Sequence, residues 1–116
     1  MFSKSDPFKA KERRKKNAIK RSLNILKNKK SDSFNIASQA IYVFVQEKFL
    51  LPSTNFDQAY VKNLLVNRVE EATIEELIHI LKICDAGKYS QDQKEDGEEL
   101  ITKTKIILQK VDKILK

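Results

Sequence analysis

The chain has 116 residues, which is enough for one small domain with a single hydrophobic core but not for two domains of ordinary size. Hydrophobic residues make up 41% and charged residues 34% of the chain, and the presence of only two Gly and two Pro favours helices over strands and disorder. The net charge is +7, but residues 1–30 carry twelve Lys and Arg against two acidic residues, whereas residues 31–116 carry eleven against fourteen. A nucleic-acid-binding fold usually spreads its cations over the folded surface, so this distribution disfavours that class.

The cysteine count and the length of the apolar runs limit the compartment and the membrane topology of the protein. Cys84 is the only cysteine, which excludes an internal disulfide and favours a reducing, cytoplasmic setting. The longest charge-free run, residues 33–46, is too short and too polar for a membrane span, which needs about 20 mostly apolar residues. No secretory signal follows the early basic residues.

The first predicted helix begins at Asp6-Pro7, because Asp can cap free N–H groups and Pro is tolerated at the first helical position. Nothing breaks the helical pattern from residue 8 to residue 30. Ile19, Leu23 and Leu26 recur at i, i+4 and i+7, so we expect only the second half to dock and the first half to be freely solvated. We accordingly divide the chain into a basic juxtamembrane-like helical segment, residues 1–18, and a single helical-bundle domain, residues 19–116.

Two further helices are predicted at about residues 34–50 and 57–68, separated by a polar turn that begins at Pro52. The first has so broad an apolar face that we expect it to be the central helix. Its face consists of Phe34, Ala37, Ile41, Phe44 and Val45, and that of the second consists of Val61, Leu64 and Leu65.

The last two helices are predicted from a capping signal and from periodicity. Thr73 stands three residues before Glu76, the spacing of a capping box, and Gly87 is the better of the two Gly for a left-handed helix end. A final helix covers about residues 92–115, and Gly97 can mark its true start. Their core positions are Ile74, Leu77, Ile78, Leu81 and Cys84, then Leu100, Thr104, Ile107, Leu108, Val111, Ile114 and Leu115. The short connections predict an all-α, compact antiparallel bundle of four to five helices with a basic, partly docked N-terminal helix.

The sequence gives little support for a catalytic or metal-binding site. Cys84 and the only imidazole, His79, lie five positions apart on one predicted helix, about 140° apart around its axis, so they do not form a nucleophilic pair. We interpret Cys84 as a small buried hydrophobe and His79 as a surface residue. One Cys and one His cannot supply a structural zinc site, and no phosphate-binding loop occurs. We therefore expect a protein that is not an enzyme and needs neither cofactor nor metal.

The basic run KERRKKNAIKR, residues 11–21, leaves three interpretations open. It can be a solvated helix face, a DNA-binding basic region, or a cytoplasmic juxtamembrane segment drawn to anionic lipid. The DNA interpretation is disfavoured because no leucine heptads follow that would dimerise the segment. The juxtamembrane interpretation explains why the charge stops where the core begins. Its candidate membrane-surface cluster is Lys9, Lys11, Arg13, Arg14, Lys15, Lys16, Lys20 and Arg21.

Several stretches together resemble the C-terminal cytoplasmic domain of the BatD proteins, in the bacterial aerotolerance (oxygen-tolerance) family. They are DPFKAKERRKKNAIKRSLNILK, ASQAIYVFVQEKFLLP, TIEELIHILKICDAGKYS and the closing amphipathic helix, which together cover nearly the whole chain. Their most specific parts are the QEKFLLP helix end and the motif of Cys84, Asp85, Lys88 and Tyr89, which is similar to the family's Cys-acid-x-x-basic-aromatic-small pattern. Independently of the resemblance, the residue types allow Asp85 and Lys88 to pair across the helix end and Tyr89 to fold its ring over the core.

The resemblance implies a helical domain on the cytoplasmic face of the inner membrane, within a single-span membrane protein that has periplasmic β-rich domains. On that view the chain begins just after the span. Its implied partners are von Willebrand A-type proteins, tetratricopeptide proteins and a MoxR-type ATPase, besides the anionic membrane surface. The domain would then be a non-enzymatic protein-interaction or scaffold domain. The alternative is a small basic-tailed helical nucleic-acid-binding protein.

Overall fold

The computed structural model describes residues 7–27, 32–53, 55–89 and 97–115, and within them all regular structure is helical. The helices are α1 (Pro7–Lys16), α2 (Ala18–Leu26), α3 (Ser33–Lys48), α4 (Gln58–Leu65), α5 (Glu71–Tyr89) and α6 (Gly97–Ile114). α1 and α2 form one bent helix, so the fold is a bundle of five helices. The predicted all-α bundle of four to five helices is confirmed.

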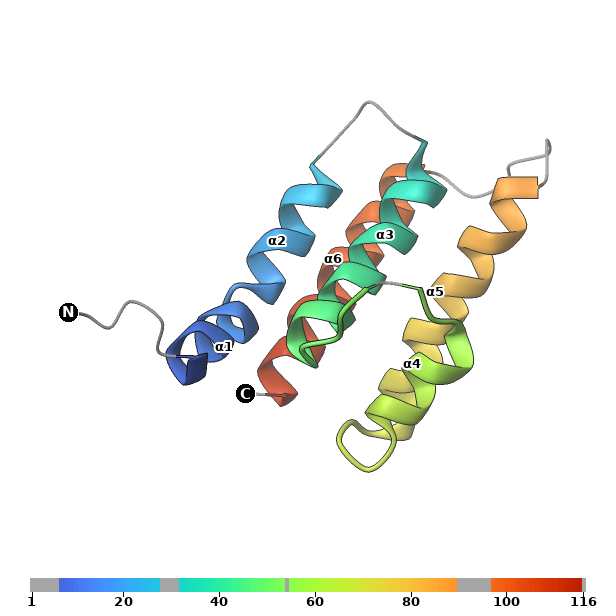
Figure 1. Ribbon diagram of the computed structural model, residues 1–116. Helices are drawn as coiled ribbons and strands as arrows, with labels where there is room; N and C mark the ends of the chain where they lie inside the picture. The colour runs from blue at the N-terminus through green and yellow to red at the C-terminus, as the bar shows by residue number, and fades with distance from the viewer. Residues whose placement is uncertain (1–6, 28–31, 54, 90–96, 116) are drawn as a thin grey trace.

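The centre of the bundle is α3, which contacts α1, α2, α5 and α6. In Figure 1 the pairs α2–α3, α4–α5 and α5–α6 run antiparallel, as expected for short connections. α3 and α4 run in the same direction, because the chain from Phe49 to Asp57 returns along the bundle before α4 begins. Because α3 contacts α1, α2, α5 and α6, the expectation that the helix predicted at residues 34–50 is the central one is confirmed.

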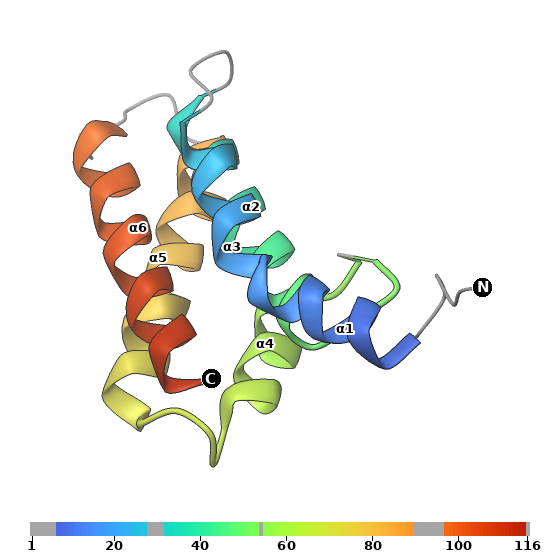
Figure 2. The same cartoon turned by 90° about the vertical axis from the view of Figure 1, so that its left-hand side faces the viewer.

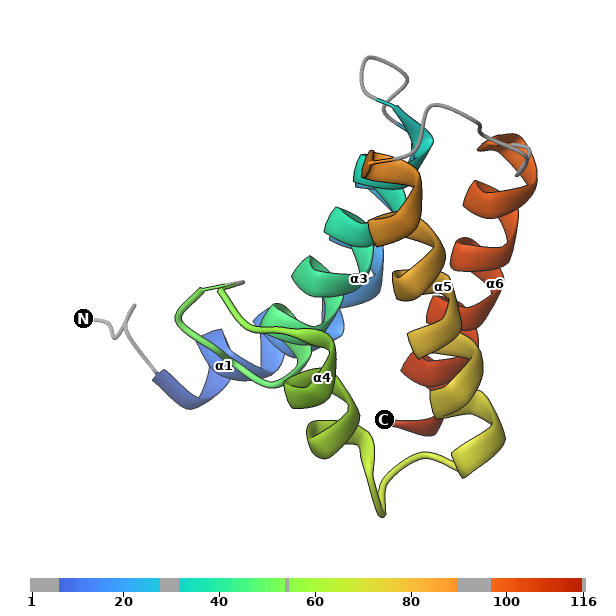
Figure 3. The same cartoon turned by 90° about the vertical axis from the view of Figure 1, so that its right-hand side faces the viewer.

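The predicted continuous first helix is bent at Asn17, which lies between α1 and α2. Figures 2 and 3 show α1 projecting sideways from one end of the bundle, while α2 lies along α3. The most buried positions of α2 are Ala18, Ser22 and Leu26, whereas the predicted Ile19 and Leu23 are only half-buried. Small side chains at Ala18 and Ser22 permit a close approach to α3, because the distance between helix axes depends on the side chains at the contact.

The end of α3 is formed without glycine. Leu50 has φ 58°, in the left-handed region, and the N–H of Leu51 donates to the carbonyl of Gln46 at 2.9 Å. This hydrogen bond closes a turn of six residues, Gln46 to Leu51, and is the 6→1 bond of a Schellman motif. At the other end of α3 the Asp32 side chain accepts from the N–H of Asn35 at 2.9 Å and so caps the start of the helix.

Two predicted helix-end signals are wrong. Thr73 does not begin a helix, because α5 already starts at Glu71; its hydroxyl instead donates to the Glu70 carboxylate at 2.8 Å. The capping partner thus precedes Thr73 rather than following it at Glu76. Gly87 does not end a helix in the left-handed conformation, since α5 continues to Tyr89 and no described glycine has positive φ.

The last helix begins at Gly97, the alternative start noted in the sequence; residues 92–96 lie outside the described part of the chain. A Cβ added to Gly97 would overlap Oγ of Ser33 and lie 3.1 Å from its Cβ. The beginnings of α6 and α3 therefore meet closely at one end of the bundle, as Figure 1 shows. This approach gives a structural reason for glycine at position 97.

The core follows the predicted apolar positions with few exceptions. Phe44, Ile41, Leu65, Leu77, Leu81, Leu100, Ile107 and Leu108 are among its largest fully buried side chains. Ile114 is wrongly predicted, because 40% of it is exposed in the last turn of α6. The prediction also missed several buried apolar residues, among them Ala18, Ile36, Val69 and Ile80.

Candidate functional site

The basic segment is divided between two faces of α1. Arg14 points to the end of α3, whereas Lys9, Arg13 and Lys16 are exposed. At 3.6 residues per turn these three cations fall within about 60° of one another around the helix axis, away from Arg14. The segment is therefore not the freely solvated helix expected from the sequence: one cation anchors it, and this anchoring orients the others.

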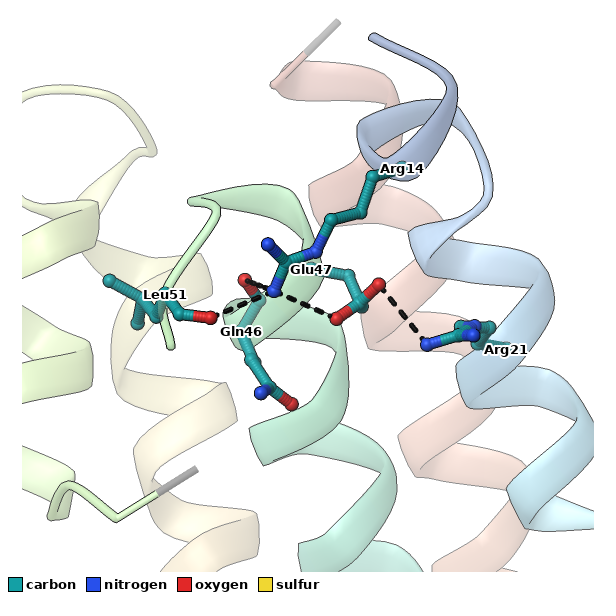
Figure 4. A network of polar contacts seen from close by, with 5 residues as sticks. All are labelled: Arg14, Arg21, Gln46, Glu47 and Leu51. Carbon is teal, nitrogen blue, oxygen red and sulfur yellow. Dashed lines mark hydrogen bonds and ion pairs between the residues drawn. The ribbon is translucent and has the colours of Figure 1, made fainter. Parts of the chain in front are cut away.

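The anchor is a contact between Arg14 and the C-terminal end of α3 (Figure 4). Nη2 of Arg14 donates to the carbonyl of Leu51 at 2.8 Å, to that of Gln46 at 3.4 Å, and to Oε2 of Glu47 at 3.0 Å. The last turn of a helix has unpaired carbonyls and a partial negative charge, so a guanidinium is stabilised there.

Glu47 receives a second arginine from the opposite side. Nη1 of Arg21, on α2, lies 3.2 Å from Oε1, while Arg14 contacts the other oxygen (Figure 4). Only 8% of the Glu47 side chain is exposed, compared with 33% for Arg14 and 65% for Arg21. Burying a carboxylate is costly unless it is paired, and here both oxygens are paired.

A second buried ion pair lies beside this network. Nζ of Lys48 donates to Oδ1 of Asp112 at 2.7 Å, and the two side chains are 9% and 11% exposed. Nζ also donates to the main-chain carbonyl of Lys15 at 3.4 Å, near the end of α1. α1, α3 and α6 are thus joined by one buried ammonium group.

A cavity of about 680 Å³ opens between these elements. It is lined by the last turn of α1, the end of α3, Arg68 in the connection from α4 to α5, and the end of α6. Cζ of Arg68 lies 5.5 Å from the centroid of the Phe49 ring, so the guanidinium packs over an aromatic face at the edge of the cavity. Its volume lies within the range of small-molecule sites.

The predicted membrane-surface cluster is thus brought together only in part. Lys9, Lys11, Arg13, Lys16, Lys20 and Arg21 are exposed, whereas Arg14 and Lys15 are partly buried. Lys15 also lies 3.6 Å from Glu12 on the same helix. Sequence reasoning missed four residues of this region, because their partners lie far along the chain: Glu47, Lys48, Arg68 and Asp112. The only available signal was at Glu47, which lies three residues after Phe44 and so places a charged residue on the apolar face of α3.

The family-like motif at the end of α5 has no catalytic geometry among the described atoms. Cys84 is fully buried and His79 is exposed, as interpreted from their helical positions. Asp85 accepts a hydrogen bond from Nε2 of Gln58, a contact between α5 and α4 that the sequence did not indicate. The side chains of Lys88 and Tyr89 lie outside the described part, so their predicted contacts stay predictions.

An aromatic cluster packs next to this motif. The ring centroids of Tyr42 and Phe56 are 5.4 Å apart, as are those of Phe56 and Tyr60. Burial raises the pKa of the Tyr42 hydroxyl, and the nearby carboxylates of Asp85 and Asp57 add to the shift. The Tyr42 hydroxyl therefore stays protonated to a higher pH than that of a solvent-exposed tyrosine.

Three comparisons bear on identity. Family models, curated proteins and solved structures give no match to this chain. The resemblance to the BatD proteins therefore stays a prediction. In the described segments no group of three His, Cys, Asp or Glu residues could hold a metal ion, and none of the helices described is long and apolar enough to cross a membrane.

Proposed function

We propose that this chain is a non-enzymatic, cytoplasmic protein-interaction domain of a membrane-anchored cell-envelope protein of the BatD type, and that its basic segment lies against an anionic membrane surface. The observation that supports the proposal most directly is the fixed orientation of α1. Arg14 attaches α1 to the end of α3, so Lys9, Arg13 and Lys16 face solvent together. A set of cations on one face matches a flat anionic surface.

A membrane surface accounts for the cations better than a duplex does. The three cations lie on one short helix that projects from the bundle, and the chain from residue 31 onward carries a net charge of −3. DNA-binding helices that enter a groove are usually accompanied by further phosphate contacts from the fold. The protein partners of the proposal come from the resemblance: von Willebrand A-type proteins, tetratricopeptide proteins and a MoxR-type ATPase.

Co-sedimentation with vesicles tests the proposal. Wild-type protein should bind phosphatidylcholine vesicles that contain phosphatidylglycerol, and not vesicles of phosphatidylcholine alone. The variant K9Q/R13Q/K16Q should bind roughly a hundredfold more weakly, because each cation near the surface contributes about 1 kcal/mol. A short DNA duplex at the same salt concentration is the competing ligand.

A matched triple variant controls for net charge. Lys62, Lys82 and Lys105 are exposed on α4, α5 and α6, so K62Q/K82Q/K105Q changes the net charge equally at other surfaces. It should retain nearly all vesicle binding. Equal loss in both triple variants, or binding to the duplex without binding to vesicles, would refute the membrane-surface proposal.

A further inference from the structure

The cavity beside α1 has an unusual balance of charges. Six of its lining residues are ionisable, four of them cations. Two cations are neutralised within the cavity wall, since Lys15 pairs with Glu12 at 3.6 Å and Lys48 pairs with Asp112 at 2.7 Å. The other two, Lys16 and Arg68, have no carboxylate partner among the residues that the structure describes.

These two cations come from different elements. Lys16 ends α1, and Arg68 lies in the connection from α4 to α5, held over the Phe49 ring. Both line the same cavity. With these two cations not neutralised, the cavity wall carries an excess positive charge that a phosphate monoester, with a charge of about −1.5 to −2 at pH 7, would balance more fully than a single carboxylate.

A buried donor lies in the cavity wall as well. The ammonium of Lys48 has three N–H donors, and its contacts with Asp112 and the Lys15 carbonyl use two of them. Because the Lys48 side chain is 9% exposed and lines the cavity, its position is fixed before any ligand arrives. A preorganised donor costs little entropy on binding.

The rest of the lining is apolar. Ile19, Phe49 and Leu115 contribute hydrophobic side chains beside the cations. A free inorganic phosphate would leave this surface in water, whereas a phosphate with an attached apolar group would cover it. The lining is therefore complementary to an amphiphile with a phosphate head.

We propose that the cavity between α1, α3 and α6 binds the phosphate group of an amphiphile, with Lys16 and Arg68 contacting its oxygens and Ile19, Phe49 and Leu115 contacting its apolar part. This inference deepens the proposed function, on which it rests, by adding a specific phospholipid site to a general attraction to anionic surfaces. Arg68 is not part of the basic segment, so the site can be tested separately from the exposed face of α1.

Titration with dihexanoyl phosphatidic acid, kept below its micelle concentration and followed by NMR chemical shifts, tests the site. Wild-type protein should bind it, with the shifts concentrated at residues around the cavity. R68Q should weaken binding at least about tenfold, the usual effect of losing a hydrogen bond to a charged group. K16Q should have a similar effect, and K62Q, which removes an exposed cation from α4, should change binding less than twofold.

Two further probes separate the sources of phosphate. Dihexanoylglycerol, which lacks the phosphate, and inorganic phosphate, which lacks the apolar part, should both bind at least tenfold more weakly than the phosphatidic acid. Equally strong binding of inorganic phosphate would refute the proposal that the ligand is an amphiphile. Absence of binding by the phosphatidic acid, or binding unaffected by R68Q and K16Q, would overturn the site.

The site and the proposed function can fail independently. If vesicle binding depends on Lys9, Arg13 and Lys16 while dihexanoyl phosphatidic acid does not bind, the site is refuted and the function is retained. If the soluble lipid binds through Arg68 but anionic vesicles do not bind, the membrane-surface proposal is refuted and the site is retained.

Discussion

Oε2 of Glu47 lies 3.0 Å from Nη2 of Arg14, so a buried carboxylate at the end of α3 is paired with a cation of the basic segment. The same guanidinium contacts two carbonyls of the α3 end. This contact decides which face of α1 is available for ligands. It also makes the stability of the bundle depend on one arginine among several neighbouring cations.

Arg14 and its neighbour Arg13 provide a matched comparison. R14Q should lower the free energy of unfolding by about 1–3 kcal/mol, because it leaves the buried Glu47 with one partner and the α3 carbonyls with none from α1. R13Q removes the same charge from an exposed position and should change stability by less than about 0.5 kcal/mol. Urea denaturation measures both variants. Similar effects of the two would show that α1 is not anchored through Arg14.

The buried pair of Lys48 and Asp112 should be sensitive to removal of one partner. D112N leaves the Lys48 ammonium unpaired in a largely buried position and should cost about 3 kcal/mol of unfolding free energy. The exposed pair of Glu99 and Lys103 is the control, and E99Q should cost less than about 1 kcal/mol. The double variant K48M/D112L removes both charges and should recover most of the loss; failure to recover would contradict this account.

Two buried serines should respond differently to replacement by alanine. Oγ of Ser22 is buried and has no hydrogen-bond partner among the residues that the structure describes, so S22A should stabilise the protein by about 1 kcal/mol. Oγ of Ser38 donates to the carbonyl of Asn35 at 3.3 Å, so S38A should be neutral or destabilising by up to about 1 kcal/mol. Thermal unfolding of both variants gives the comparison, and a loss of stability in S22A would contradict the structure around α2.

Low pH should remove the contribution that the Glu70 carboxylate makes to the stability of the folded protein. The hydrogen bond from the Thr73 hydroxyl, followed by the contact with Lys110, lowers the pKa of the Glu70 carboxyl below its ordinary value of 4.5. A lowered folded-state pKa stabilises the protein above the unfolded pKa, and the contribution is lost as the pH falls through the folded pKa. E70Q should therefore melt at a lower temperature than wild type at pH 7, and the difference should disappear at more acidic pH.

Thr73 gives the control for this pH dependence. T73V removes the leading cause of the shift and should reduce the pH-dependent difference, while leaving the contact of Glu70 with Lys110 at 3.4 Å in place. Melting temperatures measured between pH 3 and pH 7 would follow both variants. A difference between wild type and E70Q that persists unchanged at the acid end would refute the assignment.

Local patterns in the sequence were enough to predict most of the fold. The apolar positions of Ile41, Phe44, Leu77 and Leu108 recur at helical spacing, and a helix buries whichever face is apolar. The burial of Cys84 and the exposure of His79 follow from the same period. These features depend only on residues three or four positions apart, so the periodicity of the sequence is enough to predict them.

Helix ends were predicted less well, because several residues can perform the same capping role. Gly87 was available as a left-handed end, yet α5 continues through it, whereas Leu50 adopts the left-handed conformation at the end of α3. Leu50 is held there by the hydrogen bond from Leu51 to Gln46 and by the contact of Arg14 with the same turn. These hydrogen bonds around the turn therefore outweigh the intrinsic preference for glycine.

The sequence by itself determined that this protein is helical, where its core lies and that its positive charge is concentrated at one end. Only the tertiary structure decided that Arg14 turns inward while Arg13 faces solvent, and that Lys48 and Arg68 meet the basic segment around one cavity. The physical reason is distance along the chain. Arg14 and Leu51 are 37 residues apart, and Lys48 and Asp112 are 64 apart. Such pairings depend on how the helices pack and leave no periodic signal in the sequence.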